Sequence, residues 1–184
     1  MTRNYCMLSV FMFFTLASQG QFADSLKTQL LKDWKRSKTY TLDYLKIIPP
    51  DKCSFKPQDS IRTLAQQMIH LSQATVSLIE AATGMKIPGI INRQDLESIP
   101  SALTKDSVSY FVTLSYDYAI QALENFEMTK SYQFIKRGKF NETRIAWLLK
   151  AFEHQAHHRG QITIYIRALG LKPPNERLFD NMYE

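Results

Sequence analysis

Glycine and proline are scarce in this sequence, which contains 6 Gly and 7 Pro in 184 residues. A β-sandwich or barrel needs a turn roughly every ten residues and builds many turns from these two residues, so their shortage disfavours an all-β fold. The apolar fraction of 45% and the charged fraction of 22% are those of a globular protein and exclude an intrinsically disordered chain. A chain of this length buries a core without disulfides, and we expect a single domain.

Charge is almost absent from the N-terminal segment, in which Arg3 is the only charged residue before Asp24. Residues 5–16 form an apolar run, and small and polar residues follow it. A positive start, a short apolar stretch and a small-residue region are together typical of a secretory signal peptide. The alternative is a membrane anchor, which needs about 20 apolar residues, whereas this run has 12. We therefore expect a signal peptide at 1–20 and an exported domain at 21–184, periplasmic or secreted.

Cysteine is scarce too, since the chain contains only Cys6 and Cys53. Cleavage of the signal removes Cys6, so the mature domain has no internal disulfide, although an exported protein could form one. The formal net charge is +6, and the basic residues are spread along the chain. The densest basic group, within residues 32–38, fits a solvated helix face or a polyanion partner about equally well. Because export argues against nucleic acid, we expect no nucleic-acid partner and, after cleavage, no stable membrane anchor.

Four long stretches have the composition and the end signals of helices. Pro49 follows the first, Gly84 the second and Gly170 the fourth. Proline cannot continue a helix, and glycine adopts the left-handed conformation in which many helices end. Each stretch also begins at or next to a residue whose side chain can cap the start of a helix. These residues include Asp24, Ser60, Ser101 and Asn141. The predicted helices span about residues 24–48, 59–83, 101–126 and 141–169. Four long helices, joined by connections that span residues 49–58, 84–100 and 127–140, predict an all-α fold, a four-helix bundle.

Histidine is absent from the first 69 residues. Three of the four histidines fall in one five-residue stretch, 154–158, inside the last predicted helix. At about 100° per residue, His154 and His158 project to nearly the same side, about 40° apart. Trp147 and Tyr165 share that largely apolar side, which should face the bundle interior, whereas His157 points to its edge. Such a pair can present two imidazole nitrogens to one metal ion, or its members can be ordinary, partly buried, hydrogen-bonded histidines. The spacing leaves both readings open.

The fourth histidine, His70, lies on the second predicted helix. A helical wheel places it opposite the apolar stripe that includes Leu64, Met68 and Leu71. The small side chains around it could leave room for an ion, or they could mark a solvated face. The wheel by itself favours a surface residue.

The end of the chain resembles a known family signature. Residues 154–174 read HQAHHRGQITIYIRALGLKPP, which is similar to the last-helix signature of the DinB/YfiT-like family. In that signature a histidine is followed four residues later by the histidine of a His-Arg-Gly-Gln run. Two further segments resemble the end of the family's first helix and its histidine-bearing second helix; they are 42–57 (LDYLKIIPPDKCSFKP) and 60–74 (SIRTLAQQMIHLSQA).

The resemblance implies a four-helix bundle in which three histidines bind one divalent metal ion at one end. Carried over position by position, the metal ligands are His70, His154 and His158, and His157 is not a ligand. Some members of the family are thiol-dependent transferases, in which the metal activates a small thiol. For most members no reaction is established, so the resemblance implies the site more directly than the chemistry.

Three imidazole ligands leave a coordination position open, which is the arrangement of a catalytic metal site. Water or a thiol bound there would ionise near neutral pH, and zinc, nickel or iron suits the all-nitrogen donor set. We therefore expect a metal-dependent transferase or hydrolase with a small-molecule substrate, with a homodimer left open. The alternative is a non-catalytic protein that binds the metal or a small ligand.

Other residues of the last helix and its surroundings carry smaller expectations. Gln161 is expected to orient a metal ligand, with Glu153 and Tyr165 as further candidates. Gly160 costs about 1 kcal/mol in mid-helix, which predicts a close approach of a second helix. Arg159 is expected at the surface or in an interhelical pair, and Cys53 as a partly buried apolar residue.

Overall fold

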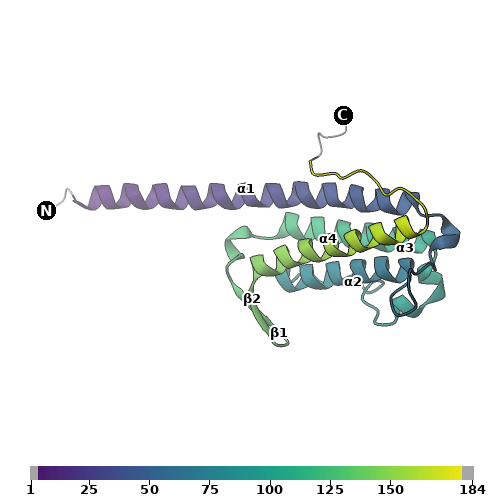
Figure 1. The fold of residues 1–184 in the computed structure, drawn as a ribbon. Coiled ribbons are helices and arrows are strands. Elements are labelled where there is room, and N and C mark those ends of the chain that lie inside the picture. The colour runs from purple at the N-terminus through teal and green to yellow at the C-terminus, as the bar shows by residue number, and fades with distance from the viewer. Residues whose placement is uncertain (1–3, 180–184) are drawn as a thin grey trace.

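A computed structural model describes the backbone of residues 4–179 and the side chains of residues 21–179. This part of the chain forms four α-helices and one β-hairpin (Figure 1). The helices are α1 (Asn4–Ile47), α2 (Leu64–Thr83), α3 (Lys105–Asn125) and α4 (Arg144–Ala168). The hairpin pairs β1 (Phe134–Arg137) with β2 (Phe140–Thr143). The predicted all-α four-helix bundle is confirmed.

The helices pack around one apolar core. α2 lies against both α3 and α4, and α1 packs mainly against α3. Trp34 of α1 is fully buried, and its ring meets Tyr116 of α3 and Phe152 of α4 edge-on, with centroids 5.7 and 5.6 Å apart. Edge-on aromatic pairs at this spacing are favourable. This cluster joins α1, α3 and α4. The remaining helix, α2, packs along α4, and the histidines of these two helices lie where they meet.

The second helix starts later than predicted and ends where predicted. Thr63 is its N-cap, and Thr63 and Gln66 form a reciprocal capping box. Residues 59–62 stay outside the helix because the linker before them bonds to its first turn: Leu64 N–H donates to the Phe55 carbonyl, 2.8 Å away. Gly84 stops the helix with φ of 79°, the left-handed conformation that glycine adopts without strain.

The third and fourth helices also begin a few residues after the predicted caps. The segment at Ser101 forms a short 3-10 helix, η3 (Pro100–Leu103), and Thr104 caps α3 by accepting a hydrogen bond from Ser107 N–H. Asn141 is not a helix start, because it lies in β2 opposite Lys136. Thr143 caps α4 instead. The hairpin was not predicted.

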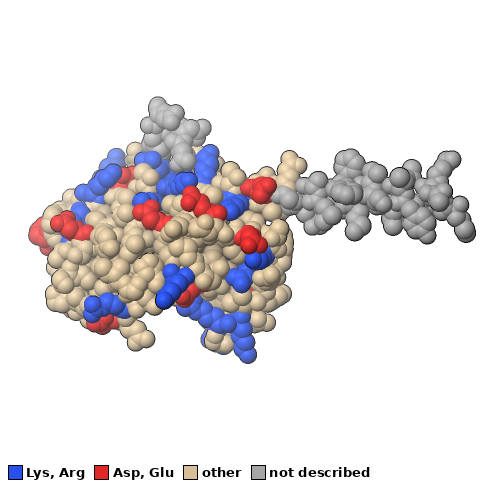
Figure 2. Space-filling model, turned by 180° about the vertical axis from the view of Figure 1, so that it is seen from behind, with Lys and Arg blue, Asp and Glu red and all other residues tan. Residues whose placement is uncertain are grey.

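The first helix extends further toward the N-terminus than the predicted start at Asp24. The predicted signal segment 1–20 falls on residues whose side chains lie outside the described part of the chain. Within the described residues, no helix combines the length and apolar character needed to span a membrane. Basic and acidic side chains are interspersed over the face that Figure 2 presents.

Candidate metal centre

Two neighbouring helices bring three of the four histidines together. His70 comes from α2, and His154 and His158 come from α4. One ring nitrogen of each lies within 4.8 Å of those of the other two. The ring centroids of His154 and His158 are 4.3 Å apart, and His70 lies 4.8 Å from His158 and 5.7 Å from His154. His157 is exposed and stays outside this group, although its ring meets the edge of His158.

His70 is partly buried, with 30% of its side chain exposed. The wheel favoured a surface position because it assumed that the side of α2 opposite the apolar stripe faces solvent. That side is covered by α4 and by the connection between α2 and α3, which contains the short 3-10 helix η2 (Leu96–Ser98). Two glutamines of α2 hold the connection in place: Gln66 donates to the Glu97 carbonyl at 3.1 Å, and Gln73 donates to the Ile91 carbonyl at 3.0 Å.

Glu97 orients the imidazole of His70. Its Oε1 lies 3.1 Å from His70 Nδ1, and its Oε2 accepts a hydrogen bond from Arg62 Nε at 2.7 Å. A carboxylate is an acceptor, so Nδ1 carries the proton and Nε2 is free to bind a metal ion. The sequence analysis did not identify Glu97. It lies in the connection between α2 and α3, and no local pattern there shows which acidic side chain contacts α2.

Gln161 performs the corresponding role for His158. Its Oε1 lies 2.8 Å from His158 Nδ1, which therefore carries the proton. The side-chain amide of Gln67 lies against both groups: its Nε2 contacts this Nδ1 and donates to Gln161 Oε1. The expectation for Gln161 thus agrees with the structure. Glu153 instead pairs with Lys150, and Tyr165 donates to the Arg62 carbonyl.

Burial disfavours the charged form of both His154 and His158. It is the largest cause that lowers the pKa of His158 to about 4, with His154 and His70 adding to the effect. It also lowers the pKa of His154, again with a contribution from His70. The Nε2 atoms of the two rings lie 3.1 Å apart. With the His158 proton on Nδ1, the lone pair of its Nε2 points at the other ring, and a shared cation would stabilise that arrangement.

The donor set fits a divalent ion of the transition series. Two nitrogens bound to one tetrahedral ion at about 2.0–2.1 Å lie roughly 3.3 Å apart, close to the 3.1 Å between His154 and His158. Three neutral imidazoles suit zinc, nickel or iron better than calcium or magnesium, which prefer oxygen ligands. Nδ1 of His154 is buried without a hydrogen-bond partner among the described residues. Of the three rings, His154 is thus the least constrained.

A hollow of about 430 Å³ opens beside the histidines. His158, Gln67 and Gln161 are among the residues that line it. Its remaining walls are mostly apolar and are formed by Pro57, Ile61, Ile164 and Tyr165, with Ser60 and Arg62. Of the three histidines only His158 lines this hollow. The two glutamines in its wall contact Nδ1 of His158, so the hollow borders the Nδ1 side of that ring and not the Nε2 atom that faces His154.

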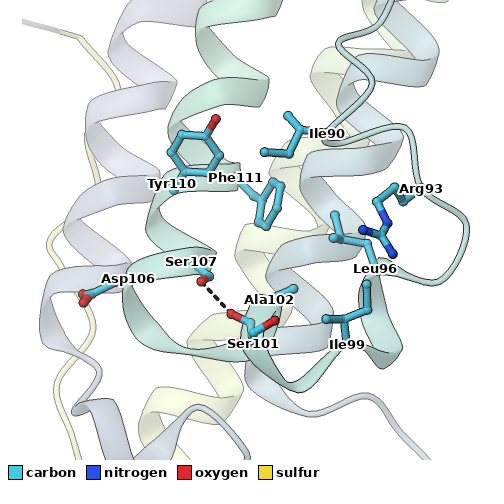
Figure 3. A pocket seen from close by; sticks show the side chains of 10 residues that line it. All are labelled: Ile90, Arg93, Leu96, Ile99, Ser101, Ala102, Asp106, Ser107, Tyr110 and Phe111. Atoms are coloured by element: carbon cyan, nitrogen blue, oxygen red, sulfur yellow. Dashed lines mark hydrogen bonds between the residues drawn. The ribbon is translucent and has the colours of Figure 1, made fainter.

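A larger hollow, of about 500 Å³, lies away from the histidines, between the start of α3 and the connection that precedes it (Figure 3). Its walls are largely apolar, with Leu96 and Phe111 among them. Two of its polar groups bond to neighbours: Ser107 Oγ donates to the Ser101 carbonyl at 2.6 Å, and Arg93 pairs with Asp95. No histidine lines it, whereas His158 lines the smaller hollow.

Three remaining expectations have clear outcomes. Gly160 is exposed, and a Cβ atom there would meet nothing within 4 Å, so the predicted close helix approach is wrong for the described chain. Arg159 is interhelical: it donates to Gln155 of its own helix and to Thr41 of α1. Its guanidinium also stacks over the Tyr40 ring. Cys53 is buried, and burial raises the pKa of its thiol.

Comparison with known proteins gives both a family and a fold. The model of the DinB family matches residues 20–184. A crystal structure of a DinB-like protein from Bacillus cereus is similar to this chain with a TM-score of 0.68 at 20% identity, covering 80% of this chain and 95% of that one. The DinB-like protein YjoA from Bacillus subtilis gives a TM-score of 0.60 at 15% identity, over 83% of this chain and 99% of its own. No curated protein matches the chain.

Proposed function

The chain belongs to the DinB family, and we propose that it is a metal-dependent enzyme whose divalent ion is held by His70, His154 and His158. The observation that carries the proposal is the convergence of three imidazole nitrogens from α2 and α4, within 4.8 Å of one another, beside a hollow of about 430 Å³. Zinc, nickel or iron fits the donor set. Three protein ligands leave a position for substrate, which distinguishes a catalytic site from a closed structural one.

When bound, a divalent ion supplies a Lewis acid that polarises a substrate oxygen and lowers the pKa of a bound water or thiol. The chain's own residues do the positioning. Glu97 fixes the tautomer of His70, and Gln161 fixes that of His158. The apolar residues of the hollow reduce the contact of bulk water with the side of His158 that lines it.

The proposed reaction is hydrolysis or group transfer on a small molecule. Hydrolysis is the simpler of the two for an exported protein, because water is available in every compartment and a thiol cosubstrate is not. Export itself is a proposal. It is supported by the signal pattern of residues 1–20 and by a family match that begins at residue 20. N-terminal sequencing of the protein recovered from the periplasm or the medium tests it; a chain that keeps its first 20 residues in the cytoplasm would refute it.

The alternative is a non-catalytic protein that binds a metal or a small ligand. One observation favours it: no aspartate or glutamate lines the smaller hollow, so the described residues place no separate general base there. The test compares metal-stripped protein with protein reloaded with zinc, nickel or iron, against a panel of ester, amide and thiol-transfer substrates. Metal-dependent turnover that is lost in His70→Ala and kept in His157→Ala supports the enzyme. Stoichiometric metal without turnover supports the alternative.

A further inference from the structure

We propose that the hollow beside the histidines binds a small amphipathic carboxylate, and that Arg62 binds its carboxylate group. The inference rests on the proposed function only in that the hollow borders His158, one of the three proposed metal ligands. It names the class of molecule that the site accepts, and it can be tested on metal-free protein.

Arg62 is the only fully charged side chain among the residues that line the hollow. Its Nε is engaged by Glu97 at 2.7 Å, whereas its two terminal nitrogens make no hydrogen bond to a described residue. Its side chain is 42% exposed, and Tyr165 donates to its backbone carbonyl at 2.8 Å. Tyr165 thus anchors the backbone of Arg62 and Glu97 holds one edge of its guanidinium, and the two terminal nitrogens remain as donors. A guanidinium presents paired donors that match a carboxylate.

The apolar residues that line the hollow favour a ligand with an apolar body. Ile61 and Ile164 are 41% and 60% exposed, and both line the hollow together with Pro57 and Tyr165. They come from different elements, the segment before α2 and the helix α4, so one apolar group between them would cover both. Burial of such surface is the main favourable contribution in ligand binding.

The volume limits the size of the ligand. Since water occupies about 30 Å³ per molecule, 430 Å³ corresponds to roughly fourteen waters. A chain of about eight carbons with one carboxylate is smaller than this volume and fits within it. Octanoate is therefore a suitable probe. Its neutral isostere octanamide and the short acetate ion separate the contributions of charge and of apolar length.

The experiment measures binding of these probes to the full chain by calorimetry, with metal removed and with metal restored. Octanoate should bind metal-free protein at one site and at least tenfold more tightly than octanamide or acetate. Arg62→Gln should weaken octanoate roughly ten- to a hundredfold, since a hydrogen bond to a charged group contributes about 1.5–3 kcal/mol. Arg62→Lys should retain part of the affinity. The matched control is Arg93→Gln, because Arg93 is a similarly exposed cation that lines the larger hollow; it should change nothing.

Ile164→Ser provides a second variant at an exposed position, where folding is not at risk. It should weaken octanoate and leave acetate unchanged. The proposal is overturned if octanoate binds no better than octanamide, or if Arg62→Gln binds it as tightly as the native protein. It is also overturned if octanoate binds only when metal is present, because the carboxylate then binds the ion and not Arg62. A protein that holds no metal but still binds octanoate through Arg62 would refute the proposed enzyme and leave this inference standing.

Discussion

Glu97 Oε1 lies 3.1 Å from His70 Nδ1, so a carboxylate from the connection between α2 and α3 fixes the orientation of an imidazole on α2. The same carboxylate accepts from Arg62, which lines the hollow beside the histidines. Glu97 thus links a proposed metal ligand to a proposed substrate-binding residue. Outer partners of this kind set the tautomer and raise the basicity of a ligating histidine.

Replacement of Glu97 by glutamine should weaken metal binding without unfolding the protein. The amide loses the negative charge that favours a proton on Nδ1 of His70, and the loss of such a partner typically costs tenfold to a hundredfold in metal affinity. Competition with a chromophoric chelator measures the affinity. Glu153→Gln is the matched control, because Glu153 is exposed and pairs with Lys150 away from the site. Equal metal affinity in both variants would remove Glu97 from the site.

Acid should destabilise the metal-free protein through His158. Burial lowers the pKa of this residue to about 4 in the folded state, from 6.5. Between these values the unfolded chain binds more protons than the folded one, so stability is present above about pH 6.5 and is lost as the pH falls toward 4. The midpoint of urea unfolding should therefore drop less between pH 7 and pH 4.5 in His158→Gln than in the native protein. His157→Gln, at an exposed position, should behave like the native protein. If His158→Gln shows the same drop as well, His158 is not kept neutral by the fold.

Substitution of Gly160 by alanine should stabilise the protein. The residue is exposed in mid-helix with free space for a Cβ atom, and alanine is favoured over glycine there by about 0.5–1 kcal/mol. Urea unfolding at micromolar protein concentration measures the change. The control is Gly84→Ala, which should destabilise, because the φ of 79° at Gly84 strains any other residue. A loss of stability in Gly160→Ala would mean that another surface, such as a second copy of the chain, covers this face.

The sequence predicts the features that depend on neighbouring residues. Gly84 stops α2 as expected, and the four-residue spacing of His154 and His158 sets their rings side by side on α4. The hairpin escaped prediction because two four-residue strands are too short to show alternation, although Gly138 in its turn is a hairpin signal.

The features that depend on distant parts of the chain were not predictable from local pattern. His70 was assigned to the site by family resemblance and against the wheel, because the wheel cannot show that a connection folds back over α2. The same fold-back brings Glu97 to His70. The prediction for Gly160 was wrong. Because glycine destabilises the middle of a helix, we expected a second helix to pack closely against it, but no described residue does so.

Elemental analysis of the purified protein, after incubation with zinc, nickel or iron and removal of excess metal, tests the central claim most directly. The native protein and His157→Ala should each hold one equivalent of a divalent metal, and His154→Ala and His158→Ala should hold far less. Circular dichroism should show all four to be folded. A native protein without stoichiometric metal, or a His158→Ala variant that keeps a full equivalent, would contradict the three-histidine site.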